Sequence, residues 1–475
     1  MNKTMAKPLT LLVLLVVLVS FLSLEGCSSS ASSPVTEISA TAATSSIADE
    51  ATTIPTETPP EPGDSVDLAS QRSEFDADNE TIVTAQTNFR PDGNRIVDGV
   101  GNIPAQAPID IALEGEPVWV LALPSGEGML WAVVLEDGRT QAFVVRNGRV
   151  ETYAITPAQI PAGMPPLLQL EKGAARIVVP ANDVSPLTHP VFFNERGDMA
   201  YIDTKGNLVV RQEDTTTVLP VNAQADARIL VDENGRLLLY TDPTDEYGHG
   251  IMGDKVEAGS LTLVATQPAP GAIRTIPVSD DGYVLEGIAP IWVDLDRDGA
   301  REIIVTRSNS DDGAQIVVLN EMGDLVATGP AIGLGGRWRH QLAAGPFGPD
   351  GEMELVDVLT PHIGGPTEFF QWRDGNLVLV TSVDGYTSHV IGSRNLDMAV
   401  AGQFDQSGRL TVLLPNQART ALGAIQHGSD GAEVAWTLPL SGTLVTNIAA
   451  STLADDRLAV GVGQDNNTLR VWQEP

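Results

Sequence analysis

The sequence predicts an all-β fold, a β-propeller, and three observations carry this prediction. From about Glu116 onward, runs of four to six apolar or β-branched residues alternate with turns such as "EDGR", "RNGR" and "ENGR", as in strands joined by hairpins. This stretch shows no amphipathic helix of normal length. Above the strands lies a repeat of about 40 to 60 residues, and such repeats, holding about four strands each, are typical of propeller blades.

The first segment has the layout of an export signal. Two lysines precede the apolar run Leu9–Leu24, and Gly26 precedes Cys27, the single cysteine of the chain. The segment resembles a bacterial lipoprotein signal, with Leu24, Gly26 and Cys27 matching the lipobox. The resemblance implies that residues 1–26 are removed and that Cys27 becomes the lipidated N-terminus. A single-pass anchor is the alternative, although the apolar run is short for a membrane span.

Three further regions follow the signal. Residues 27–70 are rich in Ser, Thr, Ala and Pro and contain no lysine or arginine, so we expect a disordered tether that buries no core. Residues 71–115 are a lead-in segment, in which "APIDIALEG" (107–115) could supply a strand that closes the ring. Residues 116–475 are the expected propeller.

We expect seven blades of four antiparallel strands each. Because a blade buries its faces only against its neighbours, the ring must close. The last blade is one or two strands short, and the segment from the lead-in would complete it. The expected blades lie near 116–155, 166–220, 226–282, 287–335, 339–384, 389–437 and 442–475.

The charge of the chain limits its partners. The 28 Lys and Arg against 62 Asp and Glu give a formal charge of −34, which repels nucleic acid phosphates and anionic lipid headgroups. We therefore expect no nucleic acid partner and contact with a membrane only through the N-terminal lipid. The signal and tether together predict an extracytoplasmic location, lipid-anchored in a bacterial cell envelope. The protein is expected to be monomeric.

An acidic loop, residues 294–302 ("DLDRDGARE"), has the spacing of a calcium site. Carboxylates at positions 1, 3 and 5, glycine at 6 and a backbone carbonyl at 7 can wrap a hard cation. An EF-hand would need glutamate at position 12, where Val305 stands, so the carboxylate at position 9 would close a shorter loop that leads into a strand. A solvated acidic turn is the alternative. The expected ligands are Asp294, Asp296, Asp298, the backbone carbonyl of Ala300, and Glu302.

The acidic loop returns in weaker copies. In 346–358, Asp350, Gly351 and Glu354 match positions 298, 299 and 302, and further copies lie at 403–414 and 451–462. A loop of this form between strands, repeated at blade spacing, resembles the FG-GAP/VCBS-repeat propellers, the architecture of integrin α-chain heads. The resemblance implies that the five ligands above hold calcium. Because the other copies lose aspartates, we expect one Ca²⁺ with a structural role.

Histidine and arginine side chains gather in one class of segment. They lie in loops that lead into the first strand of a blade, or in insertions beside it, and in a propeller such loops converge around the central channel. A cationic mouth on so acidic a protein could hold a carboxylate or an acidic sugar. Hydrogen bonding between blades is the alternative. The candidates are His189, His249, Arg337, Arg339, His340, His362, His389 and Arg394.

Three functions fit these features. The first is an envelope-anchored, calcium-stabilised module that binds a glycan or an extracellular protein without chemistry. The second is an extracytoplasmic lyase or hydrolase of acidic polysaccharide, in which a His–Tyr or His–Arg pair abstracts a proton α to a carboxylate. The third is a scaffold of an envelope complex. The chain has no G-x-S-x-G or H-E-x-x-H motif, and the sequence leaves open whether it is an enzyme.

Overall fold

The computed structural model describes residues 83–87, 90–156, 159–161, 163–180, 183–194, 196–278 and 282–474. The expected signal, Cys27 and tether lie outside these residues. Within them, no helix is long and apolar enough to cross a membrane. Apart from short 3-10 turns, including η1 (Ile103–Ala105) and η3 (Pro361–Ile363), the regular structure is all β.

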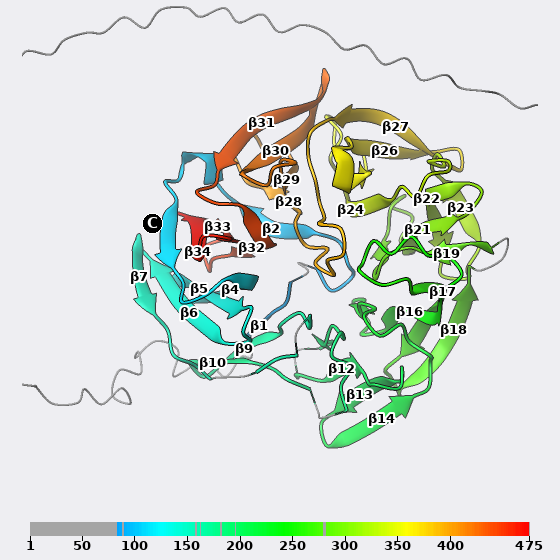
Figure 1. Cartoon of the computed structure of the whole chain (residues 1–475), viewed down its shortest axis with the longest axis horizontal. Helices are drawn as coiled ribbons and strands as arrows, with labels where there is room; N and C mark the ends of the chain where they lie inside the picture. Colours follow the sequence, from blue (N-terminus) through cyan, green and yellow to red (C-terminus); the bar gives the residue numbers. More distant parts are fainter. Residues whose placement is uncertain are drawn as a thin grey trace, which may run out of the picture. The chain divides into compact units, whose positions relative to one another are not determined.

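The described strands form a β-propeller of eight blades, numbered here in chain order (Figure 1). Blade 1 comprises β4 (Pro117–Ser125), β5 (Gly128–Leu135), β6 (Thr140–Arg146) and β7 (Arg149–Thr152). Blade 2 comprises β8 (Ile155–Thr156), β9 (Leu168–Glu171), β10 (Ala174–Ile177) and the distant β1 (Val83–Ala85). Blade 3 comprises β11 (Val191–Phe192), β12 (Met199–Ile202), β13 (Leu208–Gln212) and β14 (Thr215–Leu219).

Blades 4, 5 and 6 belong to one 13-stranded sheet, in which β19 (Val284–Leu285) links the first two. Blade 4 comprises β15 (Leu230–Val231), β16 (Leu237–Thr244), β17 (Glu257–Ala265) and β18 (Gly271–Pro277). Blade 5 comprises β20 (Ile291–Val293), β21 (Glu302–Asn309), β22 (Gly313–Asn320) and β23 (Leu325–Thr328). Blade 6 comprises β24 (Arg339–Gly345), β25 (Glu354–Leu359), β26 (Thr367–Arg373) and β27 (Asn376–Val383).

The last two blades each take a strand from the lead-in. Blade 7 comprises β28 (Val400–Gln403), β29 (Thr411–Pro415), β30 (Ala421–Gly428), β31 (Gly431–Pro439) and β2 (Ile96–Val100), which pairs parallel with β28. Blade 8 comprises β32 (Leu444–Thr452), β33 (Leu458–Gln464), β34 (Thr468–Gln473) and β3 (Ile109–Ala112). The segment from which a closing strand was expected forms β3, which pairs antiparallel with β34.

The number of blades is one more than the seven expected from the sequence. The range 166–220, expected to be one blade, is divided between blades 2 and 3. Blade 2 contains one short hairpin, β9–β10, which pairs with β1 on one side and with β8 on the other. Because β1 comes from the lead-in, a local repeat pattern cannot show this blade.

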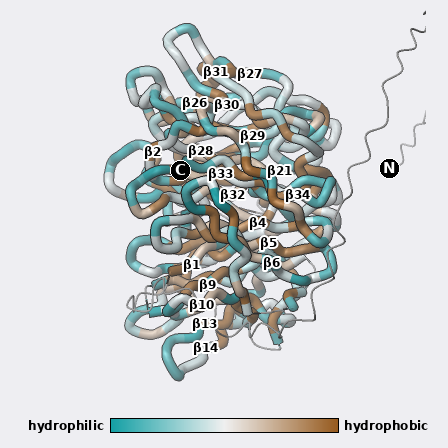
Figure 2. Tube along the Cα trace, turned by 90° about the vertical axis from the view of Figure 1, so that its left-hand side faces the viewer, coloured by the Kyte–Doolittle hydropathy of each residue, from teal (hydrophilic) through white to brown (hydrophobic). Residues whose placement is uncertain are grey.

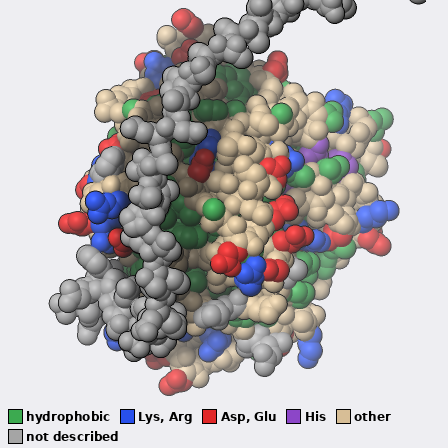
Figure 3. Space-filling view, turned by 60° about the vertical axis from the view of Figure 1, so that its left-hand side comes forward, with side chains coloured by type: hydrophobic (Ala, Val, Ile, Leu, Met, Phe, Trp, Pro, Cys, Tyr) green, Lys and Arg blue, Asp and Glu red, His purple; other side chains and the backbone are tan. Residues whose placement is uncertain are grey.

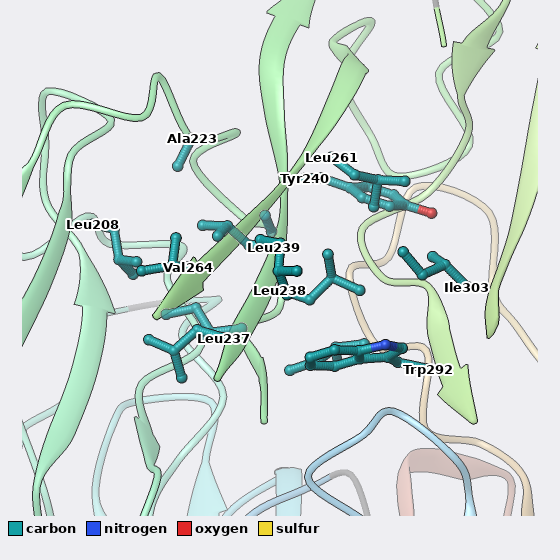
Figure 4. Packing of buried hydrophobic residues seen from close by; sticks show 14 of the residues in the cluster. Leu208, Ala223, Leu237, Leu238, Leu239, Tyr240, Leu261, Val264, Trp292 and Ile303 are labelled. Atoms are coloured by element: carbon teal, nitrogen blue, oxygen red, sulfur yellow. The ribbon is translucent and has the colours of Figure 1, made fainter. Parts of the chain in front are cut away.

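Apolar strand residues form the core between neighbouring blades. Figure 2 shows hydrophobic stretches along the strands and hydrophilic turns at their ends. In Figure 4, Leu208 of blade 3, Leu237–Tyr240 of blade 4 and Trp292 of blade 5 belong to one buried cluster. Blades 8 and 1 are also in close contact. A Cβ added to Gly461 of blade 8 would lie 2.4 Å from the Trp131 ring of blade 1. The blades therefore support one another around the ring.

The lead-in also lines the middle of the ring. Residues 91–95, called the inner segment, bind the first strands of four successive blades, 4 to 7. The N–H groups of Val231, Trp292 and Ala401 donate to the carbonyls of Pro91, Asp92 and Arg95, respectively. The Ala344 N–H donates to the Asn94 side chain. The innermost backbone donors, which would otherwise face the channel, are satisfied by the chain itself.

Candidate functional site

The antiparallel order of each blade defines two faces of the ring. Connections between the second and third strands, and from the last strand of a blade to the first of the next, open at one end, called the loop face. Connections between the first and second strands, and between the third and fourth, open at the other end, called the turn face. By this topology every candidate histidine lies on or next to the loop face, and the acidic loop lies on the turn face.

The loop face is closed by a small apolar cluster, called the cap. It consists of Ile251, Met252, Ile288, Trp338 and Leu396, each at most 2% exposed. These residues come from the insertion in blade 4 and from the loops that enter blades 5, 6 and 7. The Gly392 N–H donates to the Ile251 carbonyl at 2.8 Å, which ties two of these loops together.

Three candidate histidines surround Trp338. Its ring stacks on His340 at 4.7 Å between centroids and on His362 at 6.1 Å, and His389 meets it edge-on at 5.3 Å. His362 Nε2 and His389 Nδ1 share a hydrogen bond of 2.7 Å, and His340 Nδ1 bonds to Ser388 Oγ at 2.8 Å. The sequence prediction that these residues converge agrees with this geometry.

Burial decides what these histidines can do. His340 and His389 are 1% and 2% exposed, whereas His362 is partly exposed. Burial lowers the pKa of His362 to about 4 and that of His389 to about 3, and it holds the pKa of His340 well below its usual value. All three are therefore neutral imidazoles at pH 7, and only His362 is open to a ligand.

A network of buried charges lies beneath the cap. Asp397, which is fully buried, accepts hydrogen bonds from Arg228 at 2.7 and 2.5 Å and from Arg95 at 3.3 Å. Burial alone would raise the pKa of Asp397, but the charges of Arg228 and Arg95 hold it at about 2. His189 lies beside this network, since its backbone pairs with that of Arg228, and burial lowers its pKa.

The remaining arginine candidates take different places. Arg394 bonds to Asp226 at 2.8 Å and to Asp254, across the cap. Arg337 is exposed and donates to the Ile332 carbonyl at 2.6 Å. Arg339 does not reach the loop-face cluster, because it points into blade 6 and pairs with Asp357 and Glu368 at 2.8 and 2.6 Å. Arg339 and His340 are adjacent on one strand, so their side chains leave on opposite faces.

His249 lines a separate pocket of about 250 Å³ with Tyr247, Asn309 and glycines of the loop before blade 6. Its Nδ1 pairs with the buried Glu286, which also accepts a hydrogen bond from Ser308. The hydrogen bond to the Glu286 carboxylate raises the pKa of His249. A carboxylate that orients a histidine beside a pocket is the usual arrangement for proton transfer.

On the turn face, the acidic loop brings three of its five expected ligands together. Carboxylate oxygens of Asp294, Asp296 and Glu302 lie within 4.8 Å of one another. Asp298 is outside this group, and its Oδ1 accepts the Ala300 N–H at 2.7 Å. Burial and the neighbouring aspartates raise the pKa of Glu302 to about 7. Hard oxygen donors held this close fit a calcium ion.

In the weaker copies of this loop, other side chains bind the residue at the position of Glu302. Glu354, the counterpart of Glu302 in blade 6, is bonded by His427 Nδ1 at 2.9 Å and by Gln371 at 2.7 Å. In blade 7 the counterpart is Thr411, which accepts from Gln426 at 2.8 Å. In blade 5, Glu302 has one hydrogen-bond donor among the described residues, the Leu295 N–H at 2.8 Å.

The pairing across the strands explains this difference. Asn320 is opposite Glu302, at the place that Gln371 and Gln426 occupy in the other two blades. Its shorter side chain bonds within its own turn, to Asp324 and to the N–H of Met322. Blade 5 therefore lacks the internal donor that its neighbours have, and its carboxylates face one another.

Sequence reasoning missed several residues of these sites. Arg95 and Asn94 belong to the segment "RPDGNRIV" (90–97), which carries no strand or ligand pattern of its own. Glu286 is an isolated acid before a strand, and only the fold places it beneath His249. In each case the partner is distant in sequence, so a local motif gives no signal.

No family model matches the chain, and no curated protein matches it. Among solved structures, it is similar to Raptor from Chaetomium thermophilum, with a TM-score of 0.42 and 11% identity over 80% of this chain and 29% of that one. It is similar to BamB from Moraxella catarrhalis, with a TM-score of 0.42 and 13% identity over 78% and 99% of the two chains. A chain of a mitotic checkpoint complex gives 0.38 and 13%, over 78% and 95%. The chain thus spans less than a third of the Raptor chain, and these likenesses concern the fold alone.

Proposed function

We propose that the protein is a calcium-stabilised propeller, lipid-anchored in the bacterial cell envelope, that binds a glycan or a protein through its loop face. The observation that carries binding rather than chemistry is the burial of His340 and His389 behind Trp338. These histidines stabilise the cap. The groups left for a ligand are Arg337, His362 and the rims of the adjoining loops.

The proposed calcium ion occupies the acidic loop, in the manner of the FG-GAP/VCBS repeats that the loop resembles. It replaces the internal donors that blades 6 and 7 use. The test is thermal unfolding of the full chain with calcium and with chelator. We expect a rise in melting temperature with calcium that disappears in Asp296→Ala. A matched change at Asp350, in the weaker copy of the loop, should leave the calcium response intact; equal responses of wild type and Asp296→Ala would refute the site.

The proposed anchor is tested separately at Cys27. Metabolic labelling with a palmitate analogue should label the wild-type chain in a bacterial host and should leave Cys27→Ser unlabelled. Labelling that persists in Cys27→Ser, or wild-type protein found wholly in the culture medium, would remove the anchor from the proposal without affecting the binding function.

The His249 pocket favours one alternative, a lyase of acidic polysaccharide. Tyr247 and His249 meet edge-on at 6.2 Å between ring centroids, and Glu286 orients the imidazole. A His–Tyr pair placed in this way can abstract a proton α to a carboxylate. Alginate, polygalacturonate and hyaluronan separate the two functions, because lyase cleavage creates an unsaturated sugar that absorbs ultraviolet light. Binding without new absorbance supports the module, whereas absorbance that His249→Ala abolishes supports the enzyme.

A further inference from the structure

Three aliphatic side chains stand out on the loop face. Ile363, Leu334 and Ile391 are 75%, 68% and 65% exposed, which makes them the most exposed large hydrophobic residues in the described part of the chain. Leu334 lies in the loop that enters blade 6, Ile363 lies in η3 of blade 6, and Ile391 lies in the loop that enters blade 7. These three residues are called the apolar rim.

The three loops that carry the apolar rim meet at the partly exposed His362. Ile363 follows His362 directly, Ile391 is two residues beyond His389, and Leu334 is four residues before Trp338. The rings at these three anchor points are 5.0 to 6.1 Å apart. Figure 3 shows histidine side chains at the surface of one face of the molecule.

The loops that carry the rim are held in place by hydrogen bonds. Thr360 N–H donates to the Trp338 carbonyl at 2.8 Å, and Arg337 Nη2 ties its loop through the Ile332 carbonyl at 2.6 Å. The Gly392 N–H is bound to blade 4 through Ile251. Anchored loops therefore keep the aliphatic tips in water rather than letting them collapse, which favours binding because little order is lost.

The charge of this sector differs from that of the chain as a whole. Residues 329–338, 360–366 and 385–396 contain no aspartate or glutamate, although the protein has 62 of them. Arg337 is exposed there. At the border, Asp254 pairs with Arg394 and Asp312 accepts from Tyr283, whereas Asp311 and Asp384 are exposed. The sector thus complements a ligand that is apolar and negatively charged.

We propose that the apolar rim is the docking surface for a segment of a partner protein that bears aliphatic side chains and a carboxylate, with the carboxylate paired to Arg337. This inference rests on the proposed binding function and names the class of its ligand. A membrane fits less well, because these loops contain no lysine and expose no tryptophan or tyrosine, and surface binding to lipid uses basic clusters and interfacial aromatics.

The test is selection of a random dodecapeptide library on the full chain, followed by calorimetry with the selected peptide. We expect peptides that combine aliphatic residues with Asp or Glu. The triple variant Leu334→Ser, Ile363→Ser, Ile391→Ser should weaken binding at least tenfold, and Arg337→Ala should weaken it several-fold and reduce its dependence on salt. The matched control, Met322→Ser, Leu325→Ser, Val218→Ser, changes equally apolar exposed residues outside this sector and should bind as wild type.

Several results would overturn the inference. These are a library that yields no binder, peptides that bind the rim variant as well as the wild type, and rim-dependent sedimentation with phosphatidylglycerol vesicles in place of peptide binding. Rim-dependent self-association would identify a second copy as the occupant instead. If the rim variant still binds a glycan, the binding function stands and only this inference fails; if the wild type binds neither glycan nor peptide, both fail.

Discussion

The buried carboxylate beneath the cap is paired within the chain, whereas that of the acidic loop has no charged partner among the described residues. Beneath the cap, Asp397 is neutralised by Arg95 and Arg228, one from the lead-in and one from the loop before blade 4. In the acidic loop, Glu302 lies against Asp294 and Asp296, and the chain supplies a single backbone donor to it among the described residues. The network beneath the cap is complete in the folded chain, whereas the acidic loop leaves room for the calcium ion that we propose.

The comparison teaches how the two faces divide their roles. The loop-face network joins the lead-in to blades 4, 6 and 7, so it holds the ring together regardless of ligands. The acidic loop is local to one blade and can respond to calcium without altering the rest. Stability and metal response should therefore separate by face.

The largest expected effect is that of Asp397→Asn. The change leaves two buried guanidinium groups without their carboxylate, and breaking a buried pair in this way costs about 3–5 kcal/mol. The free energy of unfolding, measured by denaturant titration, should fall by this amount with or without calcium. Asp296→Asn in chelator is the control and should change it by less than about 1 kcal/mol, as is usual for exposed sites. Similar losses of stability from both variants would contradict the proposed difference between the charge network beneath the cap and the acidic loop.

Glu354→Gln should have an intermediate effect. Glu354 is fully buried and receives His427 from blade 7, so the amide would lose a charge-assisted bond between two blades. A buried donor left poorly paired costs about 1–3 kcal/mol. Denaturant titration of Glu354→Gln, with His427→Gln and the double variant, forms a cycle that measures the coupling. Additive losses would show that the pair contributes nothing.

Acid should loosen the cap before it loosens the blades away from it. The pKa of His362 and His389 is lowered in the folded chain to about 4 and about 3, against about 6.5 when unfolded. Below pH 6.5 the unfolded chain therefore binds protons that the folded chain excludes, so stability falls progressively as the pH drops toward 4. Hydrogen exchange at pH 7 and pH 4.5, corrected for intrinsic rates, should show lost protection in residues 360–366 and 384–399 first. Loss that begins at the strands of blade 1, away from the cap, would contradict this order.

The sequence is a good guide to whatever repeats locally. Strand runs and turn pairs predict the propeller, and the acidic loop is recognisable because its carboxylates are close in sequence. The same reasoning misses blade 2, whose strand β1 comes from Val83–Ala85, and it miscounts the blades for that reason. Pairing between distant segments has no local signature.

The sequence pattern also could not predict which of the loop histidines are buried. His340 and His389 do lie together, as their positions before first strands predict, and His362 joins them from the loop between β25 and β26. The residues that bury them, such as Met252 and Leu396, are ordinary apolar residues in loops. Arg339 and His340 share a motif and take opposite sides of β24, because strand side chains alternate. Which side faces the channel depends on register, and register is fixed by the whole blade.

The smallest expected effect is the sharpest test of the comparison. In chelator, Glu302→Gln removes a carboxylate whose pKa is raised to about 7 by burial and by the adjacent aspartates, so the apo protein should become slightly more stable, by less than about 1 kcal/mol. In calcium the same variant should be less stable than the wild type, because a ligand is lost. Glu354→Gln, the same change one blade later, should destabilise in both conditions. Thermal unfolding with and without calcium measures this reversal of sign. It is expected only if a calcium ion binds the carboxylate of blade 5 in the way that His427 binds that of blade 6.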